Sequence, residues 1–128
     1  MAERRLTGLA KATKRYAQLG QARPANTTAV SLYSPAVNVV GFIQRIHICN
    51  QTGSAATCRV FLDNDGTTYD ETTALEFDKS IGANNSLEFD YGEQGMPMSD
   101  DSGNLAVRTG TASALTFTAW GYELIGNG

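Results

Sequence analysis

The only histidine of the chain, His47, is the first residue to consider for chemistry. One imidazole cannot build a multi-histidine metal site, and as a catalytic base it would need a nucleophile beside it. Serine and aspartate are abundant, but the chain has no Gly-x-Ser-x-Gly motif. His47 shares a predicted strand face with Arg45, which favours a surface or interface role. We therefore expect no enzymatic activity and no catalytic residue.

Acidic residues surround the turn Asn64-Asp65-Gly66, namely Asp63, Asp65, Asp70 and Glu71. Carboxylates at alternate loop positions can bind calcium, which prefers several oxygen ligands. The full calcium-binding motif needs a third acidic residue before the glycine, and Asn64 does not stand at one of the alternate positions that supply ligands. We expect an acidic, solvent-facing turn here, with no metal and no cofactor.

Two cysteines, Cys49 and Cys58, permit at most one disulfide within the chain. If residues 50–56 formed a hairpin turn, the two would face each other, and directly opposed cross-strand cysteines make strained bridges. The N-terminus also lacks the apolar segment of a secretory signal peptide, which argues for reduced thiols. We expect buried thiols that act as small apolar side chains.

Charge divides the chain into a basic arm and an acidic body. Residues 1–23 hold six basic residues and one acid, a net charge of +5, whereas residues 24–128 hold four bases and 12 acids, a net charge of −8. The arm is either a solvated leader or an interaction segment. Nucleic acid is an unlikely partner because the acidic body would repel phosphates, so we favour docking onto protein.

Residues 1–25 are accordingly predicted to be a docking arm, for which a partly helical conformation is one option. Apolar residues recur there at three- and four-residue spacing, although Gly8 and Gly20 weaken a helix. The residues expected to dock are Arg4, Arg5, Leu6, Leu9, Lys11, Lys14, Arg15, Tyr16 and Leu19.

Beyond Pro24, short segments of alternating polarity are separated by turn residues about every ten positions. Hydrophobic residues make up 41% of the chain and charged residues 18%, and no run approaches the roughly 20 apolar residues of a membrane span. The clearest alternation places Leu87, Phe89 and Tyr91 opposite Glu88 and Asp90. Strands are expected over residues 28–34, 42–49, 57–63, 74–81, 86–91, 105–109 and 115–125.

This pattern predicts an all-β fold over residues 26–128, a seven- to eight-stranded antiparallel sandwich or jelly roll. In the last strand the apolar phase changes near Ala119, which indicates a bulge or a change from core to interface. Aromatic residues are enriched in the centres of protein interfaces. A core position or a subunit interface is therefore expected for Tyr91, Trp120 and Tyr122.

Two stretches resemble the small β-sandwich virion proteins of tailed bacteriophages. Residues 45–63, RIHICNQTGSAATCRVFLD, match an apolar strand that ends in an Asn-x-Thr/Ser-Gly turn and continues into an Ala-Thr-x-Arg-Val-x-Leu strand. Residues 111–124, TASALTFTAWGYEL, are similar to the last strand of those proteins. The basic arm has no matching counterpart in them.

The resemblance implies a non-enzymatic virion structural protein, assembled in the host cytoplasm. It favours a capsid decoration or cement protein that self-associates, with a trimer expected, and that binds the major capsid protein through its arm. One alternative is a tail, collar or baseplate component bound to other tail proteins. A carbohydrate- or ligand-binding sandwich is an alternative of another class, and an exposed aromatic platform beside Asn and Asp side chains would favour it.

Overall fold

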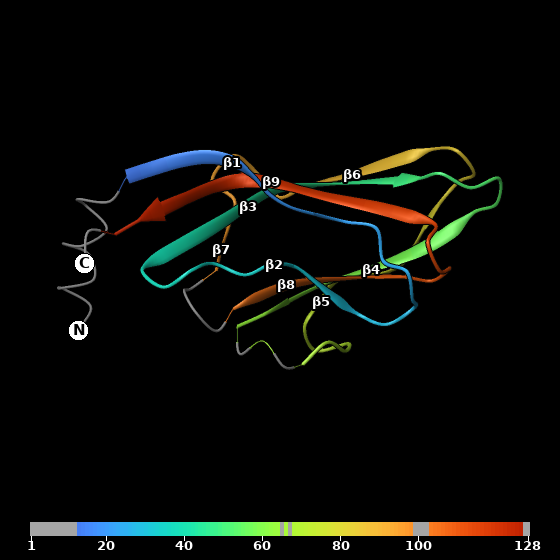
Figure 1. The fold of residues 1–128 in the computed structure, drawn as a ribbon, viewed down its shortest axis with the longest axis horizontal. Coiled ribbons are helices and arrows are strands. Elements are labelled where there is room, and N and C mark those ends of the chain that lie inside the picture. Colours follow the sequence, from blue (N-terminus) through green and yellow to red (C-terminus); the bar gives the residue numbers. More distant parts are fainter. Residues whose placement is uncertain (1–12, 65, 67, 99–102, 127–128) are drawn as a thin grey trace.

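A computed structural model describes residues 13–64, 66, 68–98 and 103–126. In these residues nine strands form two antiparallel sheets that pack face to face as two layers (Figure 1). No helix among them is long and apolar enough to cross a membrane. The strands are β1 (Thr13–Ala22), β2 (Val30–Tyr33), β3 (Val39–Asn50), β4 (Ala56–Asp63), β5 (Ala74–Ile81), β6 (Ser86–Asp90), β7 (Met96–Met98), β8 (Asn104–Thr109) and β9 (Leu115–Ile125).

The order of the strands is that of a jelly roll. One layer, sheet A, has the order β1-β9-β3-β6, with β7 also beside β3, and the other, sheet B, has the order β2-β8-β4-β5. The chain crosses between the layers after most strands, so each sheet is made of strands distant in sequence (Figure 1). The predicted all-β sandwich is confirmed, and strand order identifies it as the jelly-roll form.

Strand β1 comes from the segment predicted to be a docking arm. Thr13–Ala22 is an edge strand that pairs with β9, rather than a helix. A helix of this length gains little stability alone, whereas pairing with β9 provides hydrogen-bond partners for the backbone along one edge of the strand. The other arm residues with expected roles, Arg4, Arg5, Leu6, Leu9 and Lys11, lie outside the described residues.

The core lies between the sheets and is built by alternation along their central strands. Sheet A contributes Ile43, Ile46, Ile48, Leu115 and Phe117, each fully buried, and sheet B contributes residues of β4 and β8. The alternating segment of β6 also follows the prediction, since its apolar side chains pack against this core and its acids do not.

Two β-bulges lie in the strands on either side of Trp120. Each shifts by one residue which side chains of its strand point to the outer face of sheet A. Strand β3 shifts register between Ile43 and Arg45, and β1 shifts between Gln18 and Gly20, while β9 runs regularly between them. Simple alternation over residues 42–49 predicts one face for Phe42, Ile46 and Ile48, and this is wrong for Phe42, which lies on the outer face and stacks on Tyr122. The bulge supplies the one-residue offset that periodicity alone does not reveal.

The regular course of β9 also explains the change of apolar phase near Ala119. Ala119 and Glu123 face the interior, whereas Trp120 and Tyr122 stand on the outer face of sheet A. The strand does not change face. Its outer side instead changes from threonine to aromatic residues, and the bulges lie in the neighbouring strands β1 and β3 rather than in β9.

The turn after β3 is an arch between the two sheets and not a hairpin, so Cys49 and Cys58 do not face each other across a ladder. Both cysteines are free thiols, and burial raises the pKa of Cys58 to about 12. Asn50 anchors the arch: its buried amide donates to the carbonyls of Ser54 and Ile81 and its oxygen accepts the Thr52 amide. The Asn-x-Thr-Gly pattern therefore has a structural role here.

Candidate binding surface

The outer face of sheet A combines aromatic and charged side chains. Its aromatic strip, which we define as Lys14, Tyr16, Phe42 and Tyr122, runs from edge strand β1 across β9 to β3. Tyr16 is 66% exposed, while Tyr122 is almost covered. Contiguous apolar patches on a surface are frequent sites of interaction, and here the exposed Tyr16 adjoins the partly covered Phe42 and Tyr122, so this strip is a candidate contact surface.

The aromatic strip is held together by ring packing. Tyr122 stacks on Phe42 with ring centroids 4.7 Å apart and meets the Tyr16 ring at 5.5 Å. The Lys14 ammonium lies 4.2 Å from the Tyr122 centroid and 4.9 Å from the Tyr16 centroid. Contact with Tyr16 raises the pKa of Lys14, so the lysine stays charged over the rings at neutral pH.

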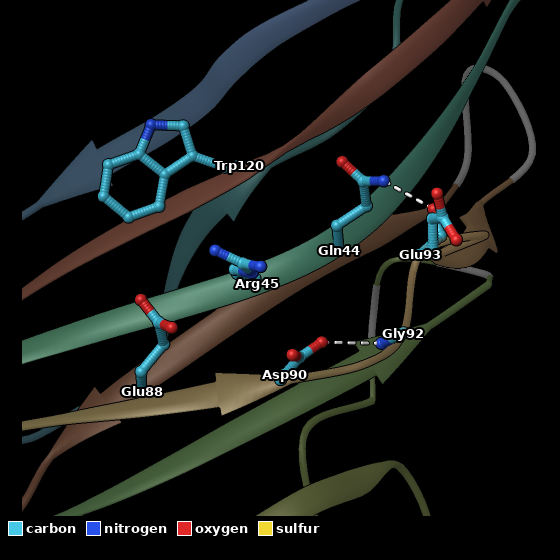
Figure 2. Close-up of a pocket in the computed structure, with 7 residues that line it drawn as sticks. All are labelled: Gln44, Arg45, Glu88, Asp90, Gly92, Glu93 and Trp120. Carbon is cyan, nitrogen blue, oxygen red and sulfur yellow. Dashed lines mark hydrogen bonds between the residues drawn. The ribbon is translucent and has the colours of Figure 1, made fainter.

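Beside the aromatic strip lies an open hollow of about 680 Å³, drawn in Figure 2. Arg45 and Gln44 of β3 lie across its middle, Trp120 of β9 stands on one side, and acidic residues line the other. In the view of Figure 2 the plane of the Trp120 indole faces the viewer. The lining residues are Gln44, Arg45, Glu88, Asp90, Gly92, Glu93 and Trp120.

One wall of the hollow is the turn that follows β6, and hydrogen bonds fix it. Asp90 accepts the amide of Gly92 at 2.9 Å, and the Gln44 side chain donates to the carbonyl of Glu93 at 2.5 Å (Figure 2). Tyr122 donates to the carbonyl of Gln94 at 2.8 Å. Gly92 has a φ of +94°, a conformation that favours glycine. The wall is thus preformed by the protein itself.

An interior carboxylate connects β1 to both sheets. Glu123 is buried, accepts a hydrogen bond from the Arg15 guanidinium at 2.5 Å, and accepts another from the Tyr33 hydroxyl at 2.7 Å. Burial and the Glu123 charge raise the pKa of Tyr33. This contact joins strands β1, β9 and β2, so it has a structural function. Local pattern does not reveal this contact, because Glu123 stands in an otherwise apolar segment.

The four described docking candidates of the predicted arm differ in their surroundings. Leu19 packs against the core at the β1 bulge. The Arg15 guanidinium pairs with Glu123, although its side chain is 61% exposed. Lys14 and Tyr16 lie on the outer face in the aromatic strip. Three of the four candidates are therefore exposed, and one of these, Arg15, is held by an ion pair.

The three aromatic residues considered for an interface do not lie together. Trp120 is 39% exposed on the outer face, and Tyr122 is beside it in the aromatic strip. Tyr91 instead packs against the core and donates to Glu76 of sheet B, and burial raises its pKa. Tyr69, in the loop after β4, packs on Phe61.

The acidic turn after β4 has structural hydrogen bonds where it is described. Asp63 accepts the amide of Thr68 at 2.6 Å. Asp70 accepts the amide and hydroxyl of Thr72, and these hydrogen bonds lower the pKa of Asp70. Asp65 lies outside the described residues. In the described part of the chain, no three His, Cys, Asp or Glu side chains form a group that could hold a metal.

The hollow was not predicted, although parts of its signal are present in the sequence. Glu88 and Asp90 alternate with the apolar side of β6, and Arg45 was expected to point away from the core. What the sequence lacks is the pairing of Arg45 with Asp90 on one side and Trp120 on the other. Sheet pairing brings distant residues together. Gln44 and Trp120, for example, are 76 positions apart in the sequence and line the same hollow.

Comparisons with known proteins identify viral particles among similar structures. No family model and no curated protein matches the sequence. A chain of the T13 particle of infectious bursal disease virus (IBDV) has 13% identity and a TM-score of 0.39, covering 91% of this chain and 31% of that one. A chain of the Gx strain of that virus has 17% identity and a TM-score of 0.33, with coverages of 91% and 40%.

A chain of the Gt strain of the same virus has 11% identity and a TM-score of 0.34, with coverages of 94% and 31%. The protein thus spans less than half the length of each of these three chains. Because the TM-scores are below 0.5, the fold assignment rests on the strand order of the two sheets.

Proposed function

We propose that the protein is a non-enzymatic structural component of a virion, and more narrowly a capsid decoration or cement protein that self-associates and docks through its N-terminal arm. Two features support the class. The strand order is a jelly roll, a fold used by viral capsid domains. The arch that contains Asn50 carries the turn motif by which the chain resembles small phage virion proteins.

The observation that carries the docking proposal is the exposure of the aromatic strip next to the arm. Tyr16 is 66% exposed and the Lys14 ammonium lies over the rings, and both residues follow directly on residues 1–12. Aromatic side chains are enriched in interface centres, and tyrosine is frequent among the residues that contribute most to binding. A protein surface that covered this strip would also receive the basic arm and its charge.

Presence in the virion is tested on viral particles purified by density-gradient centrifugation. We expect an antibody against the protein to detect it in the particle fraction, and gold label to mark the capsid at regular positions. Label confined to the tail would favour the tail, collar or baseplate alternative instead. Absence of the protein from purified particles would contradict the proposal altogether.

Docking and self-association are tested with exposed-surface variants. We expect Tyr16→Ser combined with Lys14→Glu to weaken attachment to particles, while Val37→Ser, which changes a residue equally exposed at 66%, leaves it unchanged. A truncation should stop at residue 12, because removal of residues 13–22 would delete β1. Light scattering on the full chain measures the oligomer, for which we expect a trimer.

A further inference from the structure

We propose that the hollow beside Trp120 is a binding site for a neutral saccharide. This function goes beyond a structural role in a virion and does not depend on it. The proposal rests on the shape of the hollow, its single aromatic face and the charges that surround that face.

The size and construction of the hollow suit a small ligand. At about 680 Å³ it falls within the volume range of small-molecule sites, although it is open along one side. Its wall at residues 92–94 is held by hydrogen bonds from Gln44 and Tyr122. A preformed wall reduces the ordering that a ligand must impose, which matters for weakly bound ligands such as sugars.

Trp120 provides the stacking face. Trp120 is 39% exposed, and its ring centroid lies 6.3 Å from that of His47 in a T-shaped contact. Figure 2 shows the indole beside the polar groups that line the hollow, so its exposed part is an aromatic surface next to them. The C–H face of a pyranose ring packs on such a surface, and burying it there removes apolar area from water.

The polar groups around Trp120 suit hydroxyl groups. Glu88, Asp90 and Glu93 offer carboxylate acceptors, and Arg45 offers several donors. Hydroxyl-to-carboxylate hydrogen bonds are charge-assisted and stronger than neutral ones. No ion pair with Arg45 is found among the described residues, so its guanidinium is available to a ligand. Acceptors and donors next to one aromatic face match the hydroxyls of a sugar whose C–H face lies on the ring.

The charge of the hollow excludes anionic ligands. Three carboxylates against one guanidinium repel anions, including acidic sugars. The same net charge attracts cations, so a basic peptide such as the N-terminal arm of another copy is the competing occupant that the experiment must separate from a sugar. A neutral molecule with many hydroxyls is the ligand that uses the Arg45 donors, the carboxylate acceptors and the indole together.

The experiment uses Trp120 as its own probe, because it is the only tryptophan of the chain. The full-length protein is titrated with neutral oligosaccharides of glucose, mannose, galactose and N-acetylglucosamine, and fluorescence emission is recorded. We expect a saturable shift at millimolar concentrations with at least one of these sugars. An oligomer of an acidic sugar and a synthetic peptide of residues 1–12 are titrated in parallel.

Variants separate binding from folding. Glu88→Gln removes one carboxylate whose side chain is 45% exposed, and we expect binding to weaken about fivefold to tenfold. Trp120→Ala, followed by calorimetry, should weaken binding about tenfold or more. Phe77→Ala is the matched control, since Phe77 is equally exposed at 39% but belongs to β5 of sheet B, and it should bind as the parent does.

Three results would overturn the proposal: no saturable response to any neutral sugar, a response to the peptide alone, or sugar binding that Trp120→Ala and Glu88→Gln leave unchanged. A response to the acidic sugar alone would also overturn it, because that result contradicts the charge argument. None of these results bears on whether the protein is found in purified particles.

Discussion

Removal of the Tyr33 hydroxyl tests whether the contact with Glu123 stabilises the sandwich. Both residues are buried, and the hydroxyl donates to the carboxylate at 2.7 Å. A hydrogen bond to a charged group contributes about 1.5–3 kcal/mol. Because Arg15 remains to compensate the carboxylate, we expect the lower half of that range. Tyr33→Phe should therefore lower the free energy of unfolding by about 2 kcal/mol.

The charge contribution is isolated by repeating Tyr33→Phe in a Glu123→Gln background. There the acceptor is a neutral amide oxygen, so the same substitution should cost only about 1 kcal/mol. The difference of about 1 kcal/mol is the coupling between the hydroxyl and the charge. Tyr122→Phe is the matched control, because its hydroxyl bonds a neutral carbonyl and should cost the same in both backgrounds.

Free energies of unfolding are measured by urea denaturation at pH 7, followed by circular dichroism. Equal costs of Tyr33→Phe in the two backgrounds would refute the charge argument. A cost below about 0.5 kcal/mol in the parent would refute the hydrogen bond itself.

The same residue gives the stability a dependence on alkaline pH. The pKa of Tyr33 is raised above its ordinary value of 10 in the folded state, so this contribution is fully present below pH 10. Above pH 10 the unfolded state loses the proton first, and stability falls by up to about 1.4 kcal/mol per pH unit. We expect Tyr33→Phe to make this fall in stability less steep. The remaining fall should come from Tyr91, whose pKa is also raised in the folded state.

Three further predictions concern buried positions. Gly41→Ala would place a Cβ 2.5 Å from Cε2 of Tyr33, so it should lower the free energy of unfolding in urea by about 1–3 kcal/mol. Gly53→Ala is the control and should be nearly neutral, because no atom lies within 4 Å of the added Cβ. Equal costs of the two substitutions would contradict this packing. Asn50→Ala should cost about 3 kcal/mol or more in the same measurement, because the buried carbonyls of the arch lose their donor, and a cost below about 1 kcal/mol would contradict that role. Ellman's reagent at pH 8 should react with Cys58 only as fast as the protein opens, since its thiol is buried and its pKa is about 12, and a fast phase that persists in Cys49→Ser would refute this.

Local periodicity alone was enough to predict most of the strands. Alternation along β6 and β9 depends on the geometry of a single strand, in which successive side chains point to opposite faces. The turn after Asn50 is also a local feature, because its side chain bonds the backbone two residues later. These elements could therefore be located without knowing their partners.

The arm shows where local reasoning failed. Residues 13–22 have apolar spacing compatible with a helix, and their basic residues indicated a separate segment. Their strand form depends on β9, more than 90 positions away, which supplies the backbone partners and the carboxylate that receives Arg15. Spacing within a segment contains no information about such a partner.

Polarity patterns and composition were sufficient to identify an all-β chain with polar turns and an acidic body. The pairing of the strands, the positions of the bulges and the hollow that Trp120 shares with Arg45 and Glu88 follow from the folded arrangement. The reason is physical: the two-residue period of a strand is set by its own backbone, whereas the neighbours of a side chain are set by which strands the long connections of a jelly roll bring side by side.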